Sequence, residues 1–104
     1  MRQAVITTDS EVRDRLGLGP QIPDETVTAL RTAVEDAVLA VYPRADNGGG
    51  DAVEAVLGLC VAVWIAGRHS YDSGDGFTPQ ITSNLLNRYG VLLAAYRDPG
   101  TMVG

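Results

Sequence analysis

Apolar residues recur every three or four positions over long stretches of this chain, which is the spacing of one face of an α-helix. The clearest stretch runs from about Pro23 to Val41. The apolar positions of its predicted buried face are Val27, Leu30, Val34, Ala37, Val38 and Val41. The polar positions expected to face solvent are Thr28, Arg31, Thr32, Glu35 and Asp36. Tyr42-Pro43 ends this helix, because the residue before a proline is pushed out of helical geometry.

Residues typical of helix ends and turns predict a short helix before this one, and a loop and a third helix after it. A short helix runs from Asp9 to Leu16, with Thr8 or Asp9 as its N-cap and Gly17 and Gly19 at its end. The glycine-rich stretch 44–50 is expected to be a loop. Asp51 is a good N-cap for a third helix that reaches about Ser70.

A fourth helix is predicted to start with Thr78 as N-cap and Pro79 at its first position, and to run to about Arg97. Only Gln3–Thr7 could form a strand, and one strand cannot make a sheet alone. The sequence therefore predicts a single all-α domain over residues 1–104. Its expected architecture is a small antiparallel bundle of three long helices plus a short N-terminal helix.

The third predicted helix is apolar nearly all round. One face carries Val53, Val56, Leu57, Cys60, Val61, Trp64 and Ile65, and Leu59 and Val63 add apolar surface on the other side. A helix of this kind is central in its fold or faces a second partner, so the surplus indicates oligomerisation. Its most apolar run, Ala55–Gly67, is shorter than the roughly twenty residues that cross a bilayer, so a buried helix is expected rather than a membrane span. Met1–Thr8 lacks an apolar region long enough for a secretory signal, which predicts an intracellular origin.

The charge balance bears on nucleic acids. The formal net charge is −5, and all eight basic residues are arginines. Tight binding to nucleic acid needs a basic face that displaces counterions from phosphates, so acidity argues against it. A helix-turn-helix reader remains an alternative, and its best candidate side chains are Gln80, Asn84, Asn87, Arg88 and Arg97.

Each candidate for chemistry lacks a partner residue. His69 is the only histidine, near a helix C-terminus, and Cys60 is the only cysteine, within an apolar stretch. One histidine and one cysteine cannot complete a zinc shell. The glycine-rich loop has no Gly-Lys-Ser/Thr ending for phosphate, and Tyr71–Thr78 lacks calcium-loop spacing. No catalytic, metal or cofactor site is predicted, although a carboxylate pair from distant segments stays open.

The order of these elements resembles a known family. The residues that carry the resemblance are Val12-Arg13-Asp14-Arg15-Leu16-Gly17 in the short helix, Ala40-Val41-Tyr42-Pro43, Ala62-Val63-Trp64, and the last helix from Tyr89 to Arg97. Over nearly its whole length the chain resembles the head–tail connector (adaptor) proteins of long-tailed bacteriophages, a small all-α family. That resemblance implies a structural virion protein made in the bacterial cytoplasm, with no enzymatic activity, cofactor or membrane contact.

The resemblance also implies partners. Such proteins form a ring, dodecameric as a rule, beneath the portal, and they join it to a stopper or tail-completion protein. DNA passes through the lumen without specific binding, and an acidic lumen suits this because it does not hold phosphates. The implied subunit interface is Leu59, Val63 and Trp64. The implied portal or stopper contacts are Tyr71, Asp72, Asp75, Phe77, Tyr96, Arg97, Met102 and Val103. The alternative function is a small helical protein-interaction module or a DNA-binding regulator.

Overall fold

The structure is a computed structural model that describes residues 6–47 and 49–96 of the chain. Over these residues it contains helices and no strand, which confirms the all-α prediction. The elements are α1 (Asp9–Leu16), α2 (Asp24–Val41), the 3-10 helix η1 (Pro43–Asn47), α3 (Gly50–Asp72), α4 (Ser83–Arg88), α5 (Gly90–Leu93) and the 3-10 helix η2 (Ala94–Tyr96). Of the proposed strand Gln3–Thr7, only Ile6 and Thr7 lie inside the described residues, and neither is in a strand.

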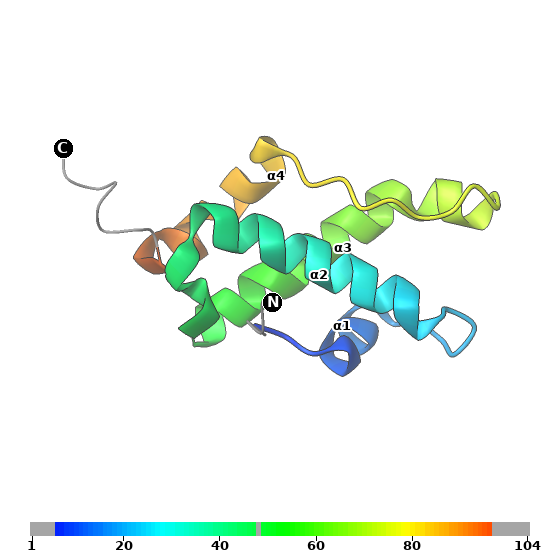
Figure 1. Ribbon diagram of the computed structural model, residues 1–104, viewed down its shortest axis with the longest axis horizontal. Coiled ribbons are helices and arrows are strands. Elements are labelled where there is room, and N and C mark those ends of the chain that lie inside the picture. Colours follow the sequence, from blue (N-terminus) through cyan, green and yellow to red (C-terminus); the bar gives the residue numbers. More distant parts are fainter. Residues whose placement is uncertain (1–5, 48, 97–104) are drawn as a thin grey trace.

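Three helices pack against one another to form the body of the molecule. Helices α2 and α3 run antiparallel, and α1 contacts both of them (Figure 1). The core lies between these three elements and includes Val12 from α1, Val34 from α2 and Val56 from α3, all fully buried. Burial of apolar side chains at this junction supplies the main driving force for folding.

Helix α1 keeps its predicted bounds because both of its ends are capped. The Glu11 amide N–H donates to the Thr8 hydroxyl at 3.2 Å, and the Thr8 N–H donates to the Glu11 carboxylate at 2.9 Å. This reciprocal pair satisfies two amide groups that a helix start leaves unpaired. At the other end Gly17 adopts a left-handed φ of 68°, where a side chain would be strained.

The face assignments on α2 and α3 need three corrections. Val41 and Ile65, which were predicted to be buried, are 44% and 68% exposed. Glu35 was predicted to face solvent and is only 3% exposed. The helical repeat gives the spacing of a buried face but not its width, and the neighbouring elements decide which flanking positions they cover.

Helix α3 is longer than predicted at both ends. It begins at Gly50 after Gly49, rather than after an Asp51 cap, and it ends at Asp72. The chain before it is not a plain loop, because residues 43–47 form η1. With 23 residues and a mean hydropathy of 1.6 over its most apolar window, α3 is long and apolar enough to cross a membrane, so the length argument against a span is wrong. Of this window 44% is buried inside the fold, where α3 packs against α1, α2 and α5.

The prediction of a long fourth helix that begins after Thr78 is wrong. Residues 75–82 form no helix and run back alongside α3, and α4 starts only at Ser83 (Figure 1). The N-cap is Thr82 rather than Thr78, since the Leu85 N–H donates to the Thr82 hydroxyl at 3.2 Å. A non-helical Phe77 can lie across α3 beside Gly67, where an added Cβ would come within 2.5 Å of its ring. The bundle therefore has two long helices, a short N-terminal one and a series of short C-terminal ones.

Candidate functional site

The three residues predicted to form a subunit interface lie in the core of the single chain. Leu59, Val63 and Trp64 are 0%, 1% and 5% exposed. Helices α1, α2 and α5 cover the sides of α3 that were expected to be surplus. The premise of that interface prediction is therefore corrected, because these side chains are not available on the surface. The large apolar side chain that α3 does leave exposed is Ile65.

The predicted portal or stopper contacts fall into two separate groups. Tyr71 and Phe77 gather on Trp64, with ring centroids 5.6 and 5.1 Å from its own. Next to them, exposed Asp72 forms an ion pair with Arg68 at 3.4 Å, and Asp75 is exposed as well. Tyr96 lies near the opposite end of α3, where its hydroxyl accepts the Gly49 N–H at 3.2 Å. Arg97, Met102 and Val103 lie outside the described residues.

An apolar groove lies between α3 and the C-terminal helices. Its lining residues are Gly58, Val61, Ala62, Ile65, Ala66, Leu85, Arg88 and Tyr89. Gly58 permits the close packing at its base, because an added Cβ there would come within 2.6 Å of the Tyr89 ring. Arg88 on the rim is exposed and forms no ion pair within the described part of the chain. The groove therefore combines an uncovered apolar floor with an unneutralised positive charge; we call it the α3–α4 groove.

A second hollow lies between α1 and the first half of α3. It is lined by Glu11, Asp14, Arg15, Val53, Glu54 and Leu57, and we call it the acidic hollow. Arg15 is paired with Glu54 at 2.7 Å, and Glu11 is engaged in the α1 cap. The exposed carboxylate of Asp14 has no such partner among the described side chains. This hollow carries the opposite charge to the rim of the α3–α4 groove.

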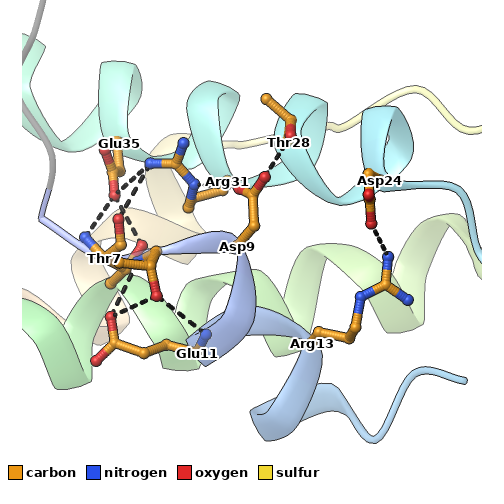
Figure 2. Close-up of polar contacts among 9 residues, drawn as sticks. Thr7, Asp9, Glu11, Arg13, Asp24, Thr28, Arg31 and Glu35 are labelled. Carbon is orange, nitrogen blue, oxygen red and sulfur yellow. Dashed lines mark hydrogen bonds and ion pairs between the residues drawn. The ribbon is translucent and has the colours of Figure 1, made fainter. Parts of the chain in front are cut away.

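A buried polar cluster ties the start of the chain to α2 (Figure 2). The amide and the hydroxyl of Thr7 each donate to the Glu35 carboxylate at 2.7 Å. Arg31 lies 3.3 Å from the same carboxylate oxygen and donates its Nε to Asp9 at 2.6 Å. Thr28 donates its hydroxyl to the second Asp9 oxygen at 2.5 Å. This cluster was not predicted from the sequence; the one signal for it was the Arg31–Glu35 spacing of four residues, which puts opposite charges on one helix face.

The electrostatics of this cluster favour a structural role. Partial burial by itself raises the pKa of Asp9, but the hydrogen bonds from Thr28 and Arg31 outweigh it and leave the pKa below 3.8. Burial lowers the pKa of Arg31, but the carboxylates of Asp9 and Glu35 outweigh it and raise that pKa above its ordinary value. Among the described residues, every buried side-chain nitrogen or oxygen has a hydrogen-bond partner. A cluster with all of its groups paired leaves none poised to react with a ligand.

The candidates for chemistry lie apart from one another. Burial, reinforced by the charge of Glu35, raises the pKa of the Cys60 thiol to about 12, so the thiol stays protonated. His69 lies exposed in the last turn of α3 and does not line the cleft formed by Leu16, Trp64 and Arg68. Over residues 6–47 and 49–96 no group of three His, Cys, Asp or Glu side chains could hold a metal ion. Of the proposed DNA-reading side chains, Gln80 precedes α4, and Asn84, Asn87 and Arg88 lie on a helix of only six residues.

Comparison with protein-family models, curated proteins and solved structures finds no match to this chain. The candidate site is therefore defined by the surface of the molecule alone. Its distinctive parts are the α3–α4 groove and the acidic hollow, which lie along the same central helix.

Proposed function

We propose that this chain is a structural subunit of a phage head–tail connector. It assembles as a ring beneath the portal, extends the DNA channel and joins the head to a stopper or tail-completion protein. The observation that carries this proposal is the uncovered apolar face of the central helix, where Ile65 is 68% exposed beside the groove. An exposed apolar patch on a small domain is typical of a surface that another protein covers.

Two further features support the proposal. The first part of the element order that resembles the connector family, a capped short helix followed by two long helices, agrees with α1, α2 and α3, whereas the expected last helix is replaced over the described residues by the short elements α4, α5 and η2. The net charge of −5 suits a channel through which DNA slides, since a surface that repels phosphates does not hold the genome. A ring of such subunits needs no reaction chemistry.

The test is co-assembly with a portal protein. The gene should lie between capsid and tail genes, and the portal encoded there is the partner to use. Native mass spectrometry of the purified chain, of the portal and of their mixture should give a complex containing multiple copies of the chain per portal ring. A chain that never joins the portal complex, whatever its own oligomeric state, would refute the connector function.

A matched pair of variants shows whether the uncovered face takes part. Ile65→Asp places a charge on the apolar floor of the groove and should abolish incorporation. Val41→Asp makes the same kind of change at a position that is 44% exposed and lines neither hollow. It should be incorporated normally. Equal incorporation of both variants would show that the α3 face is not the surface used.

A further inference from the structure

We infer that the α3–α4 groove packs against the surface around the acidic hollow of a second copy of this chain, with Arg88 of one copy facing Asp14 of the next. The inference rests on the proposed ring and names the surfaces by which its subunits meet. The occupant is another copy because the chain itself carries a surface of opposite charge.

The charge argument starts from what each patch leaves unpaired. The described residues include six arginines. Four of them form ion pairs within the chain, namely Arg13, Arg15, Arg31 and Arg68, and Arg44 does not. Arg88 forms none and lies on the rim of the groove. In the acidic hollow Asp14 is the carboxylate that no cap or ion pair engages. Bringing these two groups together pairs an unneutralised charge from each patch, which is how complementary interfaces fix their register.

The apolar surfaces match in the same arrangement. Ile65 stands out from the groove next to the small residues Ala62 and Ala66. Val53 and Leu57 are the apolar residues that line the hollow; Val53 is half-buried and Leu57 is 4% exposed. Each patch therefore combines apolar and charged side chains, as protein–protein interfaces do.

The direction of the contact follows from the two patches being different. The groove of one copy contacts the acidic hollow of the next. The copies at the two ends of an open row therefore each keep one patch free until the assembly closes. Such a heterologous contact produces rings when the rotation between neighbours closes. A symmetric dimer, in contrast, would use the same patch on both partners.

A charge swap tests the pairing. Arg88→Glu and Asp14→Arg should each weaken self-association by about ten-fold or more, because each places like charges opposite one another. The double variant with both changes in one chain should recover association to near the wild-type level. Sedimentation velocity over a concentration series at low salt measures the association, and circular dichroism confirms that each variant is folded.

Controls make the same charge changes away from both patches. Arg44→Glu and Glu25→Arg alter exposed residues that line neither the groove nor the hollow, and they should leave association unchanged. A double variant that associates no better than the single ones would overturn the pairing. So would a wild-type chain that stays monomeric at the highest concentration it tolerates.

The two proposals fail separately. If wild-type chain joins the portal while the swapped variants behave like wild type, the connector function stands and the Arg88–Asp14 contact falls. If the swap controls self-association but no assembly joins the portal, the contact stands and the connector function falls.

Discussion

Glu35 is a buried carboxylate that is paired with three donor groups. Two come from Thr7 and the third from Arg31, which lies one helical turn before it on α2. A buried charge is tolerated only when it is paired and hydrogen-bonded, so the position of residue 7 depends on residue 35. The contact fixes the approach of the chain into α1, because Thr7 directly precedes the Thr8 cap.

Replacing Glu35 with alanine should lower the free energy of unfolding by about 3 kcal/mol, since it leaves both Thr7 donors without their acceptor and removes one of the two carboxylates that pair with Arg31. Urea denaturation measures the loss. Glu25→Ala removes a carboxylate from the exposed start of the same helix and should change stability by less than about 0.5 kcal/mol. Equal effects of the two substitutions would show that the cluster adds nothing to stability.

Asp9 gives the molecule a pH dependence of known sign. Its pKa is lower in the folded chain than the ordinary 3.8, so its contribution is complete above about pH 4 and is lost as the pH falls through the folded value. Asp9→Asn should therefore be less stable than wild type at pH 7 by roughly 1 kcal/mol, with the gap shrinking in acid. Thermal unfolding of both chains between pH 7 and pH 2.5 measures it. A gap that is constant over this range contradicts the assignment.

The buried cluster marks a limit of prediction from the sequence. The helical repeat placed Glu35 on the polar side of α2, and considered as an isolated helix that assignment is reasonable. What buries Glu35 is a segment 28 residues earlier, whose approach no local pattern encodes. The acidic hollow was missed for the same reason, because Asp14 and Val53 come together only through the packing of α1 on α3.

At the scale of the element, α3 places two adjacent residues in opposite environments. Trp64 is 5% exposed and packs against Tyr71 and Phe77, whereas Ile65 is 68% exposed. A helix turns by about 100° between neighbours, so one residue can face the core while the next faces the groove. The two side chains therefore separate core packing from surface recognition.

Trp64→Ala should cost about 3–5 kcal/mol of stability, because it leaves a large cavity next to the aromatic cluster. Ile65→Ala should cost less than about 0.5 kcal/mol in the isolated chain. Denaturant unfolding of both variants gives the comparison. A Trp64→Ala chain with wild-type stability and failed assembly would make Trp64 an interface residue instead.

Gly67→Ala tests how residues 75–82 are held. The new methyl group would meet the Phe77 ring, so the ring should move off Trp64 and change the emission of the only tryptophan. Stability should change little, because a gain of about 0.5–1 kcal/mol from removing a helical glycine offsets the weakened aromatic contact. Gly50→Ala, which meets nothing within 4 Å, should leave the emission unchanged. Identical spectra for both variants would contradict the packing of Phe77.

The sequence predicted elements well where their ends carry local signals. The predicted bounds of α1 are confirmed, with Thr8 rather than the alternative Asp9 as its N-cap, and Tyr42-Pro43 ended α2 where expected. The prediction of the fourth helix was wrong because Thr78 and Pro79 are typical of a helix start, but this segment instead lies along α3, where Phe77 packs against Trp64. Local propensity is a weak guide when a tertiary contact competes with it.

At the scale of the whole molecule, charge separates the proposed functions. The net charge is −5, and of the six arginines among the described residues only Arg44 and Arg88 form no ion pair, which argues against a basic face for a duplex. The wild-type chain should therefore give no mobility shift with double-stranded DNA even at low salt, where phosphate contacts are strongest. A shift that disappears with added salt would favour the DNA-binding regulator over the connector.

Helix α4 contributes no buried residue, and yet it supplies one wall of the groove. Segments with little buried surface open at a small fraction of the global unfolding free energy, so the amide hydrogens of α4 should exchange with solvent well before those of α2 and α3. A partner that contacts α4 can bind only while this helix is folded, so local opening of α4 lowers the affinity of free chains for one another. In the proposed ring a neighbour that contacts the groove would cover α4, so the exchange of its amide hydrogens should slow on assembly.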